Sequence, residues 1–376
     1  MAQASEKIRI GITQGDPNGI GTEVITKALS NSDILELFTP IIFGTSHLFA
    51  EMGDKLQIED LRIKRINSLS DVTDGVINIL ECGSEDFEAK PGIPSEEAGR
   101  EAIVALEAAS EAVNEGEIDL LVTAPINKNT VYGEKFPYTG HTEYLEDKFR
   151  VEGGRALMIL AAGNLRVALV TTHIPLAQVA MHITKESVEE KIRDFNLALK
   201  MDFGCERPKI AVLSLNPHCG DGGVLGREEA DIITPAIEQC KSEGIMAFGP
   251  LAADGFFGSG EYNRFDGVLA MYHDQGLAPF KAIAGALGIN FTAGLNIIRT
   301  SPDHGTAYDK AGRGIADETS MREAIYAALD IARRRTNYLD ASENPLEIRT
   351  PAQRNSKRDK EKQAEAASQE QELDIE

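Results

Sequence analysis

The sequence predicts an α/β protein with largely parallel sheets. Short runs rich in Ile, Leu and Val alternate with longer amphipathic segments, the pattern of strands joined by crossover helices. The 376 residues suffice for one large or two ordinary domains, and 42% of them are hydrophobic, enough for a substantial core.

Eight segments have the composition of buried strands. In chain order they are KIRIGIT (7–13), PIIFG (40–44), INILE (77–81), DLLVTAP (119–125), ALMILAAG (156–163), RVALVTT (166–172), KIAVLSL (209–215) and GVLAMY (267–272).

Three segments predict helices. The first begins at Ser95, has a carboxylate-rich first turn and stops at Gly116, which is a good capping signature. A second runs from Thr184 to Gly204 in the same way, and the last covers residues 319–339. Residues 341–376 are charged, Gln-rich and without apolar periodicity, so we expect a disordered tail.

Composition excludes several classes of protein. A formal net charge of −22 argues against nucleic acid as a partner, because phosphate backbones are bound by basic surfaces. No segment approaches the roughly 18 apolar residues of a membrane span, and the N-terminus has no signal-peptide core, so we expect a cytoplasmic protein. The four cysteines are scattered and fit reduced thiols.

Three of the seven histidines follow predicted strands: His173, His218 and His273. The last strand ends in four polar groups in succession, at 272–275, which indicates a polar site. Ligands of parallel sheets gather outside the carboxyl ends of the strands, so three imidazoles there can converge on one divalent metal with an open position. Any one of these histidines alone is better explained as a hydrogen-bonded core or capping residue.

Two further segments indicate anion binding. In FPYTGHTEYLEDKF, residues 139–142 precede a helix, where free N–H groups and the helix dipole favour an anion, although an ordinary N-cap explains them equally well. In NFTAGLNIIRTSPDHGTAYDKAGRGIADE, Arg299 stands among Gly, Asp and His residues. A basic residue there in an acidic protein suggests an anion clamp, with a solvated strand-end charge as the alternative.

Several motifs, in one order, resemble the metal- and NAD(P)-dependent 4-hydroxythreonine-4-phosphate dehydrogenases of pyridoxal phosphate biosynthesis. From about Ile8 to Leu339 they are GDPNGIG, TAPINK, YTGHTEYLE, VALVTTHIPL, LNPHCGDGG, GPLAADGFF, AMYHDQGLAPFK and IRTSPDHGTAYDKAGRGIAD. The segment HGTAYDKAGRGIAD also resembles the adenosine-binding loop of isocitrate and isopropylmalate dehydrogenases. The resemblance implies two α/β/α domains of that fold, with the active site in the cleft between domains near a dimer interface.

The resemblance also implies roles for individual residues. His173, His218 and His273 would hold the metal. Substrate would be bound by His141, Thr142, Asp254, Lys281, Asn290 and Arg299, and the adenosine end of the cofactor by His304, Gly305 and Thr306. Either Lys281 or Asp274 would handle protons, and Lys281 has the alternative role of a charge partner for substrate phosphate or carboxylate.

Domain organisation is implied in the same way. Residues 1–129 and 285–340 would form the first α/β domain and residues 130–284 the second. The active site would mix residues from both subunits of a homodimer.

The implied activity is oxidation of 4-phosphooxy-L-threonine by NAD or NADP with decarboxylation to 3-amino-2-oxopropyl phosphate, in vitamin B6 biosynthesis. The histidines suit zinc or cobalt, and the phosphorylated substrate brings in magnesium or manganese. Asn18, Thr22 and Asn127 depart from the usual family pattern and resemble a sister group that oxidises erythronate or threonate 4-phosphate. A metal-dependent hydrolase and a noncatalytic metal-binding or scaffold protein are the alternatives from other classes.

Overall fold

The computed structural model describes residues 7–84, 86–134, 136–151 and 155–343. The chain divides into two compact units, Met1–Arg335 and Thr336–Glu376, and the sheet and the cavity described below belong to the first. Most of the predicted tail, residues 344–376, lies outside the described residues.

Twelve strands form the sheet within the described residues. They are β1 (Arg9–Thr13), β2 (Thr39–Gly44), β3 (Ile63–Ile66), β4 (Ile77–Glu81), β5 (Leu120–Thr123), β6 (Leu157–Ala162), β7 (Leu165–Leu169), β8 (Lys209–Leu213), β9 (Met246–Leu251), β10 (Gly267–Ala270), β11 (Ile289–Ala293) and β12 (Arg299–Pro302). All eight predicted strands are confirmed, and β3, β9, β11 and β12 are additional.

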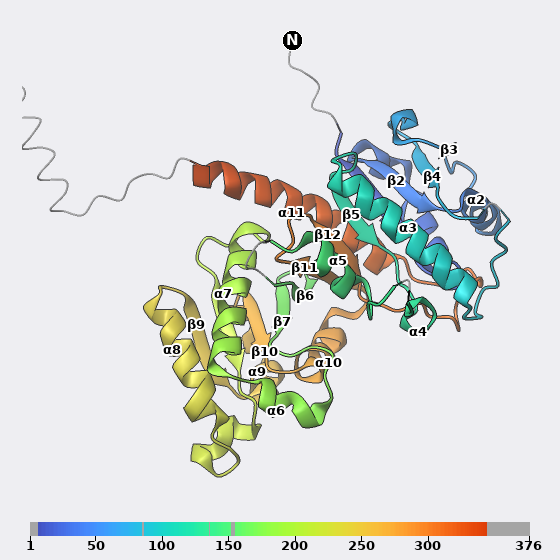
Figure 1. Cartoon of the computed structure of the whole chain (residues 1–376). Coiled ribbons are helices and arrows are strands. Elements are labelled where there is room, and N and C mark those ends of the chain that lie inside the picture. The colour runs from blue at the N-terminus through green and yellow to red at the C-terminus, as the bar shows by residue number, and fades with distance from the viewer. Residues whose placement is uncertain (1–6, 85, 135, 152–154, 344–376) are drawn as a thin grey trace, which may run out of the picture. The chain divides into compact units, whose positions relative to one another are not determined.

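The sheet is continuous, in the order β3-β4-β2-β1-β5-β12-β11-β6-β7-β10-β8-β9 (Figure 1). Only the central pairs β12–β11, β11–β6 and β6–β7 are antiparallel among the described strands, so the predicted α/β class with largely parallel strands is confirmed. In sheet order, the strands of the predicted first domain are contiguous up to β11 and those of the predicted second domain begin at β6. The division into two domains stays a prediction, because Met1–Arg335 is one compact unit.

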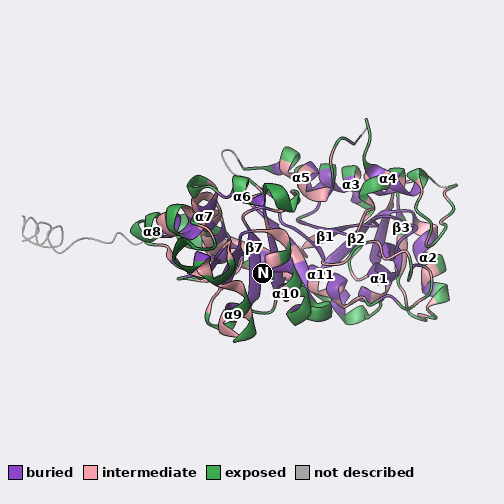
Figure 2. Cartoon of the chain, turned by 90° about the horizontal axis from the view of Figure 1, so that it is seen from below, coloured by how far each residue is buried: buried purple, intermediate pink, exposed green. Residues whose placement is uncertain are grey.

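Helices cover both faces of the sheet (Figure 2). Those in the described residues are α1 (Gly21–Ala28), α2 (Ser46–Lys55), α3 (Glu96–Asn114), α4 (Lys128–Val131), α5 (His141–Phe149), α6 (Val179–His182), α7 (Lys185–Met201), α8 (Thr234–Ser242), α9 (Ala253–Gly258), α10 (His273–Ala284) and α11 (Thr319–Glu343). None of them is long and apolar enough to cross a bilayer.

Two of the predicted helix starts, at Ser95 and Thr184, are confirmed by their caps. The Ser95 hydroxyl accepts a hydrogen bond from the Ala98 N–H at 3.1 Å. Thr184 and Ser187 form a reciprocal capping box at the start of α7. The last helix continues past the predicted Leu339 to Glu343.

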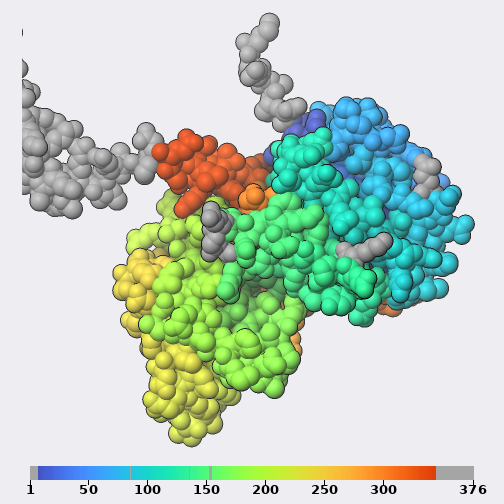
Figure 3. Space-filling model, in the orientation of Figure 1, coloured from blue at the N-terminus to red at the C-terminus, as the bar shows by residue number. Residues whose placement is uncertain are grey.

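The outer surfaces of α7 and α8 are visible in lime and yellow in Figure 3.

The core follows the alternation of the strands. In β2, Ile42 packs with one hydrophobic cluster, while Ile41 and Phe43 pack with another on the opposite face. In β10, Leu269 packs with the same cluster as Ile42, while Val268 packs with a third cluster on the opposite face. Both faces are therefore covered, and the polar groups after the strands collect at the sheet edge.

Candidate active site

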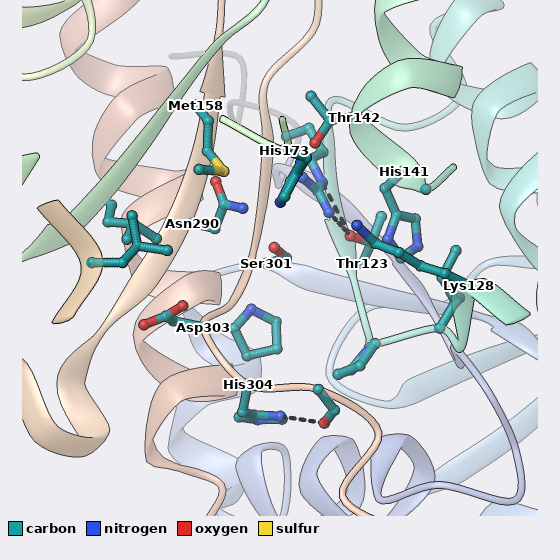
Figure 4. Close-up of a pocket in the computed structure, with 18 of the residues that line it drawn as sticks. Thr123, Lys128, His141, Thr142, Met158, His173, Asn290, Ser301, Asp303 and His304 are labelled. Atoms are coloured by element: carbon teal, nitrogen blue, oxygen red, sulfur yellow. Dashed lines mark hydrogen bonds between the residues drawn. The ribbon is translucent and has the colours of Figure 1, made fainter. Parts of the chain in front are cut away.

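A cavity of about 330 Å³ lies where the antiparallel centre of the sheet meets the starts of α5 and α10 (Figure 4). Its lining residues are Thr123, Pro125, Ile126, Lys128, Gly140, His141, Thr142, Glu143, Met158, Leu160, His173, His273, Leu277, Lys281, Asn290, Arg299, Ser301, Pro302, Asp303, His304 and Gly305.

Most residues predicted for the site line this cavity. They are His141, Thr142, His173, His273, Lys281, Asn290, Arg299, His304 and Gly305. His218, Asp254, Asp274 and Thr306 are not among the lining residues. Lining residues without a predicted role include Thr123, Lys128, Glu143 and Asp303. The sequence did contain a signal for Lys128 and Glu143 as site residues, because they belong to TAPINK and YTGHTEYLE, two of the motifs that resemble the family.

Arg299 is a buried cation of this cavity. Its residue is 2% exposed, and its guanidinium donates to the Thr123 hydroxyl at 3.0 and 2.6 Å and to the Thr292 hydroxyl at 3.1 Å. No ion pair among the described residues includes Arg299. Burial lowers its pKa to about 10, although the Glu143 carboxylate pulls the pKa upward. A buried charge without a counterion calls for an anionic ligand.

Three buried polar atoms at the cavity have no hydrogen-bond partner among the described residues: His141 Nε2, Asn290 Oδ1 and His304 Nε2. The His304 Nδ1–H donates to the Gly305 carbonyl at 3.1 Å, which leaves Nε2 as an acceptor. Burial lowers the pKa of His304, and burial with the charges of Arg299 and Lys128 holds the pKa of His141 well below its ordinary value. Such atoms are available to a ligand or to ordered water.

The start of α5 adds backbone donors to the cavity. His141 and Thr142 are its first two residues, and Gly140 precedes them. The first N–H groups of a helix have no partner within the helix, and the helix dipole places partial positive charge there. The start of α5 and Arg299 therefore bring N–H donors and a positive charge to the same cavity, which suits an anion.

The three strand-end histidines follow neighbouring parallel strands. His173 follows β7, His273 follows β10 and His218 follows β8, and these strands are adjacent in the sheet. The rings of His173 and His273 lie 5.6 Å apart between centroids. Burial lowers the pKa of His173, which favours the neutral imidazole that binds metals.

His273 is held by a neighbouring carboxylate. Its Nδ1–H donates to Asp274 Oδ1 at 2.7 Å, which leaves Nε2 for another ligand. The polar run after β10 is thus the first turn of α10 rather than a strand end. The Gln275 side chain binds this turn to the ends of two strands. Its Oε1 accepts a hydrogen bond from the Met271 N–H at 2.7 Å, and its Nε2 donates to the Ser214 carbonyl at 2.6 Å.

A complete metal site is not formed within the described residues of the chain. No group of three or more His, Cys, Asp or Glu side chains among the described residues is arranged to hold a metal ion. His173 and His273 supply two imidazoles of the type that a divalent metal prefers, and His218 is not with them at the cavity. The donor set therefore fits a metal but is one ligand short, and the three-histidine site stays a prediction.

Lys281 and Asp303 form an ion pair at the cavity. The Lys281 Nζ lies 3.0 Å from Asp303 Oδ1 and also donates to the Asp303 carbonyl at 3.0 Å. The positive charge of Lys281 is therefore already matched, in contrast to that of Arg299.

The segment 304–317 is fixed to α1. Glu23 accepts from the N–H groups of Gly314 and Ala316, at 3.1 and 2.7 Å, and Lys27 donates to the carbonyls of the same two residues at 3.0 and 2.7 Å. The Thr306 carbonyl accepts from the Ile20 N–H at 3.0 Å. Of the residues predicted to bind cofactor, His304 and Gly305 therefore face the cavity while the Thr306 carbonyl bonds the loop before α1.

The residues that depart from the family pattern hold loops together. Asn18 is 1% exposed, and its side chain bonds the backbone of Lys90 and Ile93. Thr22 is also buried, and neither residue lines the cavity. The Asn127 amide donates to the Tyr308 hydroxyl at 2.9 Å.

Comparison with known proteins gives one consistent family. The family model described as "Pyridoxal phosphate biosynthetic protein PdxA" matches residues 36–328. A 4-hydroxythreonine-4-phosphate dehydrogenase of Bacteroides thetaiotaomicron is 52% identical over 340 residues, covering 90% of this chain and 93% of the relative. A relative from Oceanobacillus iheyensis, named "Putative D-threonate 4-phosphate dehydrogenase", is 39% identical over 331 residues, 87% of this chain and 99% of the relative.

Solved structures agree. The crystal structure of a 4-hydroxythreonine-4-phosphate dehydrogenase from Klebsiella pneumoniae has a TM-score of 0.74 at 32% identity and covers 88% of this chain and 99% of that chain. A second such enzyme, from Burkholderia phymatum, has a TM-score of 0.70 at 35% identity and covers 87% of this chain and 99% of that chain.

Proposed function

This chain belongs to the PdxA family of pyridoxal phosphate biosynthetic proteins, and from that premise we propose that it is a 4-hydroxythreonine-4-phosphate dehydrogenase. The reaction is oxidation of the substrate hydroxyl by NAD or NADP with loss of carbon dioxide, which yields 3-amino-2-oxopropyl phosphate. We further propose that the enzyme is a cytoplasmic homodimer with shared active sites.

The observation that carries this proposal is Arg299. This residue is 2% exposed, and its guanidinium, with no carboxylate partner among the described residues, lies at the cavity together with the start of α5. This arrangement suits the phosphate of the substrate, because Arg and helix N-termini both bind phosphate well. His141 and Thr142 at the same helix start support this role. Asn290 offers an unpartnered amide oxygen to the substrate.

His173 and His273 would hold the metal, with His218 supplied by a second copy of the chain. A bound divalent metal would polarise the substrate hydroxyl and would stabilise the negative charge that develops on its oxygen. Asp274 orients His273, because it bonds Nδ1 and does not line the cavity. We therefore assign proton handling to Lys281, which lines the cavity and is positioned by Asp303.

His304, Gly305 and Thr306 are proposed to lie at the adenosine end of the cofactor. The unpartnered His304 Nε2 supports this role, and a Cβ built on Gly305 would meet no atom within 4 Å, so there is space for a ligand. The bonds of Glu23 and Lys27 to this segment hold it in place.

The second candidate substrate is threonate 4-phosphate, favoured by the Oceanobacillus relative and by Asn18, Thr22 and Asn127. Asn18 and Thr22 do not line the cavity, and the Asn127 amide is bonded to Tyr308. The contacts of these three residues therefore account for loop packing rather than for the choice of substrate. 4-Hydroxythreonine phosphate remains the first candidate substrate.

The test is a spectrophotometric assay of NAD(P) reduction with 4-hydroxythreonine phosphate, erythronate 4-phosphate and threonate 4-phosphate, with the metal varied. We expect the highest kcat/KM for 4-hydroxythreonine phosphate. His218→Ala should abolish turnover, while His182→Ala on exposed α6 should retain it. Unchanged turnover in the His218 variant would reject the metal assignment, and a preference for threonate phosphate would reject the substrate assignment.

A further inference from the structure

Two lysines line the cavity, and they differ in their partners. Lys281 is paired with the Asp303 carboxylate at 3.0 Å. Lys128, the first residue of α4, makes no ion pair and no side-chain hydrogen bond within the described part of the chain. Its charge is therefore available to a ligand, whereas that of Lys281 is matched.

Lys128 lies against the start of α5. A Cβ built on Gly140, the residue before α5, would lie 3.5 Å from Lys128 Cε. The positive charge of Lys128 is a cause of the lowered pKa of His141, the first residue of the same helix. Figure 4 shows Lys128 pointing into the cavity beside Thr123 and His141. Its ammonium group thus approaches the place where the α5 N–H groups and Arg299 converge.

The charge requirement of a phosphate monoester makes this position informative. At neutral pH such a group carries close to two negative charges. Arg299 supplies one unmatched positive charge, and Lys281 cannot supply the second without giving up Asp303. Lys128 is the other lining cation without a carboxylate partner among the described residues.

We propose that Lys128 is the second cation of the anion subsite and makes it selective for a phosphate dianion over a monoanion. The proposal rests on the proposed function for its substrate but not for its chemistry, which requires only a phosphate group. Arg299 fixes the phosphate from the sheet side and Lys128 contacts it from the open side, where the lysine is exposed to solvent. Lys281, which stays paired with Asp303, is then not required for phosphate binding and keeps its proposed role in proton handling.

The test uses the full-length protein and inorganic phosphate as the probe, measured by isothermal titration at pH 8. Lys128→Met should weaken phosphate binding at least about tenfold, the effect of about one lost close charge pair. Lys128→Arg should restore most of the affinity. Binding of formate, a monoanion, should change less than threefold. Lys209→Met is the matched control, because Lys209 is also exposed and lies on β8 outside the cavity.

Kinetics provide the second readout. Lys128→Met should raise KM for the phosphorylated substrate more than it lowers kcat, while Lys281→Met should mainly lower kcat. Unchanged phosphate affinity in Lys128→Met would overturn the proposal, and a loss of affinity in Lys281→Met instead would assign the second cation to Lys281. If wild-type protein binds phosphate but oxidises none of the three substrates, the proposed function fails while the role of Lys128 is still decided by the titration.

Discussion

Arg299 donates two hydrogen bonds to one hydroxyl, that of Thr123, from Nε at 3.0 Å and from Nη2 at 2.6 Å. The two residues lie on the neighbouring parallel strands β12 and β5. Thr123 is completely buried, so its hydroxyl is held in place by packing. It therefore fixes the guanidinium that we assign to the substrate phosphate.

Thr123→Val keeps the shape of the side chain but removes this acceptor. We expect the free energy of unfolding to fall by about 1–3 kcal/mol, because a buried charged donor loses its partner. KM for the phosphorylated substrate should also rise, because Arg299 is no longer oriented. Thr123→Ser, which keeps the hydroxyl, should recover most of both losses in urea denaturation and steady-state assays. Equal behaviour of the Val and Ser variants would contradict this role.

Tyr308→Phe tests the anchor of the proposed cofactor segment. The Tyr308 hydroxyl donates to Asp16 Oδ2 at 2.6 Å, and burial together with this bond raises the pKa of Tyr308 to about 12. Asp16 is fully buried, so loss of the donor should cost about 1–3 kcal/mol of stability and raise KM for NAD(P). Tyr132→Phe is the control, since Tyr132 is 64% exposed. A Tyr308 variant with wild-type melting temperature and cofactor KM would refute the anchoring role.

The sequence predicted the elements better than their long-range contacts. Strands with continuous aliphatic runs were found, and His173, His218 and His273 follow strands as predicted, but only the structure shows that these strands are adjacent in the sheet. The strand β9 was missed because MAFGPL carries glycine and proline, and β12 because RTSP has no aliphatic run. Pairs such as Asp16–Tyr308 join residues 292 positions apart, and no local periodicity reports such contacts.

Asp274→Asn examines the carboxylate behind His273. Loss of the charged acceptor at Nδ1 should lower metal affinity about 10–100-fold, because such partners orient the ring and raise its basicity. The affinity can be followed by titrating the metal-free protein with cobalt and recording visible absorbance. Asp54→Asn is the control, since Asp54 is exposed on α2 and does not line the cavity. Equal cobalt affinity in the two variants would show that Asp274 has no such role.

His141 should make stability depend on pH. Its pKa in the folded protein is lowered by burial and by the charges of Arg299 and Lys128, so between the folded pKa and about 6.5 the unfolded chain binds more protons. The corresponding stability is fully present above pH 6.5 and is lost as pH falls towards the folded pKa. In denaturation of the metal-free protein from pH 5 to 8, the free energy of unfolding of His141→Gln should therefore fall less steeply towards acid than that of wild type. The difference in slope should correspond to up to about one bound proton. His182→Gln, on exposed α6, should keep the wild-type slope, and the same slope in all three proteins would disprove the assignment.

Asp221→Gly should stabilise the loop after β8. Residues 218–222 all have positive φ, and the non-glycine members His218, Cys219 and Asp221 have φ of 51°, 53° and 46°. A single L-residue held in this left-handed region costs about 1 kcal/mol, whereas glycine adopts it freely. Asp221 is exposed, so its replacement removes no core contact. We expect the free energy of unfolding of Asp221→Gly to rise by about 0.5–1 kcal/mol relative to wild type, and Asp221→Ala to show no gain. A lower melting temperature for the glycine variant than for the alanine variant would mean that the loop after β8 is not left-handed at this residue.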